Sequence, residues 1–179
     1  MGDAVLDVKL LLFDSSKRTI DMATALVGND PLAFKKILDF ALKEKEEAYL
    51  QRAGRVLNQA VVQYPELITP YIDDLIFKLD DIKSIGLKRS LAKTLAERSF
   101  EMGEETVGVL ADKCFRYVND PSEQIALRVY SMEILYKISV SFPELKQELI
   151  SSIENQVPHS TVAIKSRGKR LLKKLLTGK

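Results

Sequence analysis

The stretch "ALRVYSMEILYKI", residues 126–138, contains neither Gly nor Pro, and its apolar side chains recur at the spacing of one helix face. Similar 13-residue stretches begin at Ala48, Gly86 and Ala163, so the four starts lie 38, 40 and 37 residues apart. A period of this length is typical of repeat proteins, in which each unit buries its apolar face against the next. The sequence therefore predicts a surface built by repetition rather than one local active site.

The four stretches agree in residue type at the positions that would face a core. Their second, sixth and tenth positions are spaced i, i+4 and i+8, which places them on one helix stripe. The tenth position is always Leu, and the sixth is never charged. In chain order these positions are Tyr49, Ala53, Leu57; Leu87, Leu91, Leu95; Leu127, Ser131, Leu135; and Ile164, Gly168, Leu172.

Partner helices with apolar stripes of their own lie between these stretches. Pro65 and Pro143 suit the first turn of a helix, and the "NDP" triplets at 29–31 and 119–121 suit an N-cap followed by Pro. Pro70 lies inside its segment, so that helix is expected to start late or to bend. The pattern predicts ten helices, over residues 4–12, 17–27, 31–44, 46–63, 66–80, 84–101, 104–118, 122–141, 143–156 and 160–177.

The helix pairs resemble HEAT repeats over about residues 15–178. In that family the second helix opens with an aliphatic residue followed by a basic one, as in Leu87-Lys88, Leu127-Arg128 and Ile164-Lys165, whereas Tyr49-Leu50 departs from this pattern. The resemblance implies an all-α, right-handed α-solenoid of about four to five helix pairs in a single domain. The expected units are about 1–28, 29–64, 65–102, 103–141 and 142–179.

The same resemblance implies a ladder of acidic turn residues that face the basic residues of the second helices. Asp80 precedes Lys88 and Asp120 precedes Arg128, by eight residues in each case. The fourth unit has Pro158 and His159 at this place, so the ladder is expected to end there. Lys88, Arg128 and Lys165 are therefore expected to have a structural role.

Composition excludes several other classes of protein. The chain has 179 residues, of which 46% are hydrophobic and 29% charged, as is typical of soluble globular domains. It shows no secretory signal pattern and no apolar run long enough to span a bilayer. The single cysteine, Cys114, excludes an internal disulfide, so a reducing compartment, the cytoplasm, is expected.

Residues for catalysis or metal binding are few. His159, in "PHSTV", is the only histidine and is expected to lie beside a helix N-cap. Cys114 falls on an apolar stripe, which predicts a core residue rather than a reactive thiol. The pairs Asp73-Asp74 and Glu104-Glu105 fall on polar helix faces, and no Gly-rich phosphate loop is found. The sequence predicts no enzyme, no metal and no cofactor.

Charge is the most informative surface property. The net charge is only +2, yet residues 158–179 contain seven basic and no acidic residues. The resemblance implies that second helices line a concave face, where basic residues dominate, while acidic residues dominate the first helices. A basic face attracts an acidic partner. The candidate partner-binding residues are Arg52, Arg55, Lys88, Arg89, Lys93, Tyr130, Arg167, Arg170 and Lys174.

Two functions fit such a face. The first is a monomeric, non-catalytic adaptor that binds an acidic protein segment. The second is a nucleic-acid binder, because some DNA glycosylases that act on alkylated bases are built from HEAT-like repeats. The chain has no Trp, and its second helices offer Tyr49 and Tyr130 as the obvious aromatic platforms, which favours the adaptor. Charged helix faces also serve solubility alone, and self-assembly through an exposed end is a third possibility.

Overall fold

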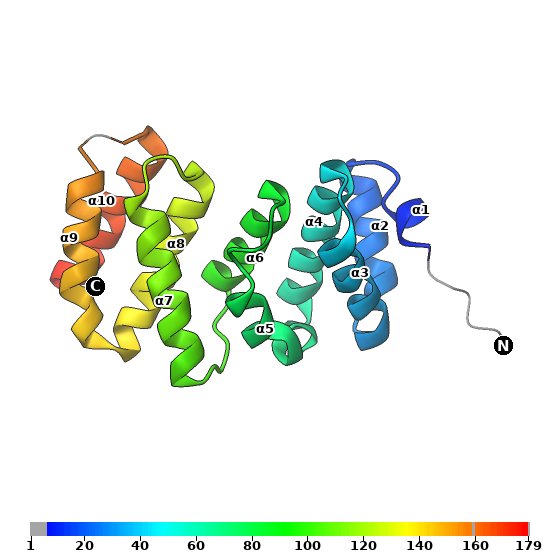
Figure 1. The fold of residues 1–179 in the computed structure, drawn as a ribbon, viewed down its shortest axis with the longest axis horizontal. Coiled ribbons are helices and arrows are strands. Elements are labelled where there is room, and N and C mark those ends of the chain that lie inside the picture. The colour runs from blue at the N-terminus through cyan, green and yellow to red at the C-terminus, as the bar shows by residue number, and fades with distance from the viewer. Residues whose placement is uncertain (1–6, 159, 179) are drawn as a thin grey trace. The chain divides into compact units, whose positions relative to one another are not determined.

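The computed structural model describes residues 7–158 and 160–178, and within these ranges all regular secondary structure is helical (Figure 1). The expected all-α class is therefore confirmed. The chain forms two compact units, Met1–Thr94 and Leu95–Lys179, with the division inside helix α6. Within each unit, helices that are close in the sequence pack side by side, as a helical solenoid of HEAT-like pairs requires.

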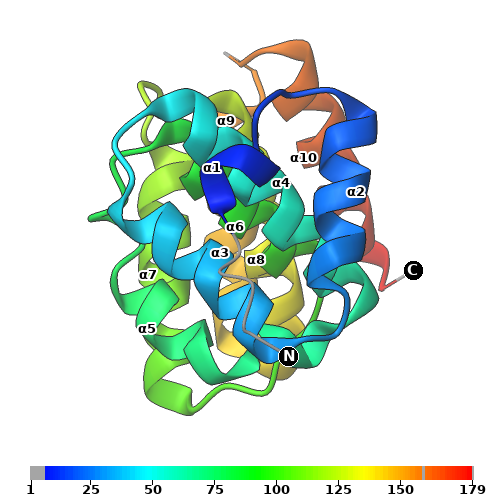
Figure 2. The ribbon, with the colours of Figure 1, turned by 90° about the vertical axis from the view of Figure 1, so that its right-hand side faces the viewer.

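Unit 1 (residues 1–94) is centred on α4, which packs against both α2 and α3 (Figure 2). Ser16 Oγ accepts a hydrogen bond from Thr19 N at the start of α2, and Asp30 Oδ1 accepts one from Leu32 N at the start of α3. The expected N-cap at 29–31 is confirmed. The elements are α1 Val8–Leu11, α2 Lys17–Val27, α3 Pro31–Lys43, α4 Glu47–Gln63, 3-10 turns Pro65–Leu67 and Thr69–Tyr71, α5 Ile72–Phe77 and α6 Ile85–Glu97.

Unit 2 (residues 95–179) is centred on α8, which packs against α7, α9 and α10 (Figure 1). Because neighbours surround it, α8 has apolar residues on most sides rather than along one stripe. The elements are α7 Glu104–Asn119, α8 Ile125–Ser141, a 3-10 turn Pro143–Leu145, α9 Lys146–Gln156 and α10 Val162–Thr177.

The repeated stripe forms the core, as expected. Leu57, Leu87, Leu127 and Leu135 are each at most 3% exposed. Two predicted stripe positions, Tyr49 and Leu172, are only partly buried. The buried residues of α10 are Ile164, Gly168, Leu171 and Leu175, so Leu172 lies beside the buried face of this helix rather than on it. The small residues also act as expected, since Ala53, Ser131 and Gly168 are buried where helices approach closely.

The predicted helix over 66–80 is wrong in detail. Pro65 opens one 3-10 turn, Pro70 is the second residue of the next, Thr69–Tyr71, and the α-helical part is limited to Ile72–Phe77. A proline at position 70 has no N–H to donate to the preceding turn, so a continuous α-helix is interrupted there. The helix predicted over 84–101 also ends early, at Glu97, and residues 98–103 form a loop.

The second "NDP" triplet does not cap a helix. Asp120 Oδ1 accepts hydrogen bonds from Ser122 N (2.8 Å) and Ser122 Oγ (2.6 Å), which closes a turn instead. Helix α8 begins three residues after Ser122, at Ile125. The expected first helix is shorter than 4–12, since α1 covers Val8–Leu11, and residues 4–6 lie outside the described residues.

Candidate partner-binding surface

Two of the candidate arginines in unit 1 are engaged with the segment that precedes α2. Arg52 Nη1 donates to the carbonyl oxygens of Leu12 (2.9 Å) and Phe13 (3.2 Å), and Arg55 Nη1 donates to that of Ser15 (2.6 Å). Both side chains lie on α4 and are partly buried. They therefore attach an irregular segment to α4 by satisfying its backbone acceptors.

The other candidates of unit 1 lie on α6. Arg89 is exposed, and Lys88 and Lys93 are partly buried. Glu47, at the start of α4, accepts a hydrogen bond from Gly86 N (2.9 Å) and lies within electrostatic reach of Arg89. The basic surface of α6 thus has an acidic neighbour where the two helices begin.

In unit 2 the structure brings three candidates together on α10. Arg167, Arg170 and Lys174 are spaced i, i+3 and i+7, so they share one face. Arg167 Nη1 and Arg170 Nη2 both donate to Glu133 Oε1 of α8. Lys174 Nζ lies 5.2 Å from the centre of the Tyr136 ring, within range of a cation–π contact.

Glu133, Arg167 and Arg170 form a group that we call the arginine–glutamate cluster. The glutamate side chain is 13% exposed, whereas Arg167 is 31% and Arg170 54% exposed. One carboxylate faces two guanidinium groups, so the cluster has a net positive charge. Tyr130 lies one turn before Glu133 on α8 and is partly buried.

The charge of α10 is of a single sign. The helix has six basic residues, Lys165, Arg167, Lys169, Arg170, Lys173 and Lys174, and no acidic ones. In contrast, α7 and α9 together have five acidic and three basic residues. The expected segregation of charge between first and second helices therefore holds within unit 2, and α10 carries most of it.

Arg128 is structural, as expected from the ladder. It is 5% exposed and donates to Val118 O (3.2 and 3.3 Å) and to Gln156 Oε1 (2.6 Å). Burial lowers the pKa of this guanidinium, and the negative charge of Asp120 partly offsets the effect. The Asp120 carboxylate itself is bonded to Ser122, so it acts on Arg128 through electrostatics over distance.

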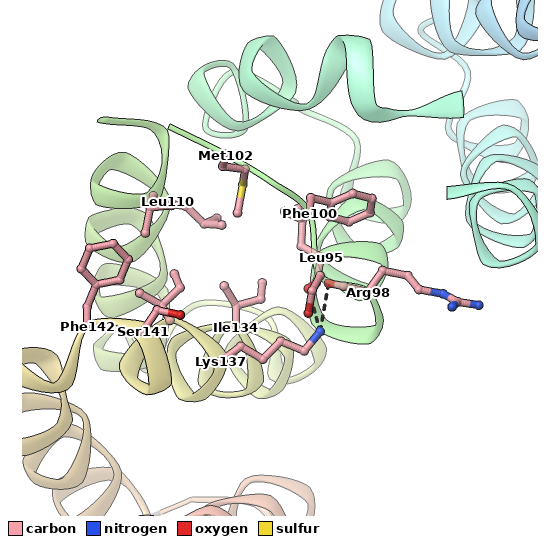
Figure 3. A pocket seen from close by; sticks show the side chains of 12 residues that line it. Leu95, Arg98, Phe100, Met102, Leu110, Ile134, Lys137, Ser141 and Phe142 are labelled. Carbon is pink, nitrogen blue, oxygen red and sulfur yellow. Dashed lines mark hydrogen bonds between the residues drawn. The ribbon is translucent and has the colours of Figure 1, made fainter. Parts of the chain in front are cut away.

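A cavity in unit 2 was not predicted from the sequence. Its volume is about 160 Å³, and Figure 3 shows the side chains of Met102, Leu110 and Ile134 pointing into a common space. The loop after α6 forms one wall, and α7 and α8 form the others. The complete lining is Leu95, Arg98, Ser99, Phe100, Met102, Val107, Leu110, Ile134, Lys137, Ile138, Ser141 and Phe142.

The cation in the cavity wall is Lys137. Its Nζ donates to Arg98 O (2.9 Å) and Leu95 O (3.4 Å) near the C-terminal end of α6, and burial lowers its pKa. The Arg98 guanidinium points away from the cavity (Figure 3). The one sequence signal for this cavity is the apolar pair Phe100 and Met102, which does not fit a solvated helix end.

The residues considered for catalysis lie as follows. Cys114 is 1% exposed, and burial raises its pKa to about 12, so the thiol is a core residue as expected. The pairs Asp73-Asp74 and Glu104-Glu105 are exposed in first turns of helices, and His159 lies outside the described residues. Across residues 7–158 and 160–178, no group of His, Cys, Asp and Glu is arranged to hold a metal ion.

None of the helices in residues 7–158 and 160–178 is both long and apolar enough to cross a membrane. A family model described as a HEAT repeat domain matches residues 9–175. No curated protein and no solved structure matches the chain.

Proposed function

Because the chain belongs to the HEAT repeat domain family, we propose that it is a non-catalytic adaptor that binds an acidic segment of a partner protein. Repeat scaffolds suit this role because their surface is formed before binding, so little conformational entropy is lost. The proposed contacts are Arg52, Arg55, Lys88, Arg89 and Lys93 in unit 1, and Tyr130, Arg167, Arg170 and Lys174 in unit 2. A monomer in the reducing cytoplasm is part of the proposal.

The observation that supports this function best is the arginine–glutamate cluster. Two guanidinium groups already hold a carboxylate there, which is the chemical group that an acidic partner would offer. A guanidinium has five N–H donors, and among the described residues each of these two gives one to Glu133. The remaining donors of Arg170 are the more accessible, since its side chain is 54% exposed.

The two arginines of α4 have a second role within this proposal. Arg52 and Arg55 hold the backbone of residues 12–15, so their replacement would alter unit 1 as well as its charge. Arg89 and Arg170 are exposed and are better suited to a test of binding.

The test uses a fluorescein-labelled peptide of alternating Glu and Ser, titrated by fluorescence anisotropy at low salt. The Arg89→Glu and Arg170→Glu variants should each weaken binding about fivefold or more, since a close like charge opposes an acidic ligand. Lys78→Glu, directly after α5, and Arg116→Glu, on α7, reverse exposed charges. They serve as matched controls that should change affinity less than about twofold. Equal losses in all four variants would reject the proposed face.

Nucleic-acid binding is the alternative that the six basic residues of α10 favour. The same proteins are therefore titrated with labelled duplex and single-stranded DNA at two salt concentrations. Phosphate binding gives a steep loss of affinity with salt, with a log–log slope of about −0.9 per phosphate neutralised on duplex DNA. Tighter binding of DNA than of the peptide, with that slope, would replace the adaptor by a nucleic-acid binder.

A further inference from the structure

The cavity of unit 2 combines apolar walls with one positive charge. Phe100, Met102 and Leu110 are joined by Ile134 and Ile138 of α8. The ammonium group of Lys137 stands in this wall with two of its three N–H groups directed to carbonyl oxygens. A ligand that fits these walls has an apolar side chain and a negative charge close by.

The size of the cavity limits the size of the ligand's apolar side chain. A volume of about 160 Å³ is close to the roughly 150 Å³ of an engineered apolar cavity that binds benzene. One Leu, Met or Phe side chain is of that size. The cavity therefore suits a single anchoring residue rather than a helix face.

The position of the cavity limits where the negative charge of the ligand can lie. Lys137 follows Glu133 by one helical turn on α8, and residues so spaced lie about 6 Å apart. Glu133 is the centre of the arginine–glutamate cluster and lies within electrostatic reach of Lys137. An extended peptide advances about 3.3 Å per residue, so the cavity and the cluster are separated by about two or three peptide residues.

We propose that the cavity of unit 2 receives one Leu, Met or Phe side chain of the acidic partner segment, and that acidic residues two or three positions away contact Arg167 and Arg170. This inference rests on the proposed adaptor function and names the sequence class of its ligand. Charge alone would attract any acidic segment, whereas the anchor selects among acidic segments.

The experiment compares two labelled peptides in the titration described above. Both have the alternating Glu and Ser background, and at one central position the first has Leu and the second Ala. Burial of the additional apolar surface of Leu should give the first peptide about ten- to thirtyfold higher affinity for the wild-type protein. Methyl resonances of Ile134, Ile138 and Met102 should shift with the Leu peptide and not with the Ala peptide.

Val107→Phe is the variant that fills the cavity. Val107 lines the cavity and is partly exposed, so the larger ring can be accommodated without entering the core. Val109→Phe makes the same change at a partly exposed position of α7 outside the lining, and it is the matched control. Val107→Phe should abolish the preference for Leu over Ala, and Val109→Phe should keep it.

The possible outcomes separate the two proposals. If both peptides bind equally well, and Arg170→Glu weakens both, the adaptor function stands and the anchor is rejected. A preference for Leu that survives Val107→Phe also rejects the cavity as its origin. If neither peptide binds wild-type protein, the proposed function itself fails, and the anchor fails with it.

Discussion

Gly168 places the backbone of α10 directly against side chains of the α9 region. A Cβ atom at this position would lie 2.5 Å from Val157 Cγ2 and 2.9 Å from Ile153 Cγ2. Overpacking of this kind costs about 1–3 kcal/mol, which outweighs the roughly 1 kcal/mol that Ala gains over Gly in a helix. We expect Gly168→Ala to lower the free energy of unfolding by up to about 2 kcal/mol, measured by urea denaturation. Gly108→Ala, in open space on α7, should instead be neutral or stabilising.

The reactivity of the Cys114 thiol tests whether the apolar stripe of α7 is buried. Because burial raises the thiol pKa to about 12, almost no thiolate exists at neutral pH. Reaction with Ellman's reagent at pH 7.5 should therefore be at least a hundredfold slower in native protein than in denaturant. Fast labelling of the native protein would show that the thiol is accessible and would contradict the assigned core.

Glu44 connects α1 to the start of α4. Its carboxylate pairs with Lys9 Nζ (2.9 Å) and accepts hydrogen bonds from the backbone N–H groups of Lys45 and Glu46. These contacts, with the Lys9 bond the largest, lower the Glu44 pKa to about 2. Because the folded pKa is depressed, the stabilisation is present above pH 4.5 and is lost as the pH falls toward 2.

Glu44→Gln removes the negative charge of this side chain, and with it the ion pair with Lys9, and leaves the size of the side chain nearly unchanged. The melting temperatures of the variant and the wild type should differ at pH 6 and converge as the pH is lowered toward 2. Glu66→Gln changes an exposed carboxylate outside this group and is the control. A constant difference between Glu44→Gln and wild type over the whole pH range would show that the ion pair has no role.

At the scale of helices, most boundaries were predictable because they depend on local chemistry. Asp30 caps α3 through its own side chain, and the apolar period of α4 is contained in its sequence. The end of α6 was not predictable. Lys137, about 40 residues later in the chain, binds the carbonyl oxygens of Leu95 and Arg98 there, and a distant donor of this kind leaves no local signal.

Arg128 connects three helices of unit 2. From α8 it donates to the C-terminal part of α7 at Val118 O and to α9 at Gln156 Oε1. Its removal leaves a buried carbonyl without this donor, and such a group costs about 1–3 kcal/mol. We expect Arg128→Ala to lower the free energy of unfolding by about 2–4 kcal/mol, measured by urea denaturation. Arg116→Ala, in an exposed pair with Asp112, should change it by less than about 1 kcal/mol.

Over the full chain, the sequence predicts the composition of the surface better than the contacts that its side chains make. The six basic residues of α10 are evident from the sequence, and so is their position on a second helix. The Glu133 contact with Arg167 and Arg170 depends on how α8 and α10 pack, over a separation of 34 to 37 residues. The cavity depends on three separate segments, so no single stretch of sequence predicts it.

The division into two compact units predicts uneven stability along the chain. In repeat proteins, stability is approximately a sum of terms for units and for their nearest-neighbour interfaces. Arg128→Ala removes contacts within unit 2, so native-state amide exchange should accelerate there, in α7, α8 and α9, by at least about tenfold. Amides of α3 and α4 in unit 1 should exchange at nearly the wild-type rate, as measured by mass spectrometry of peptic fragments. Equal acceleration in both units would show that the chain opens as one cooperative whole, and the two units would then have no independent energetic meaning.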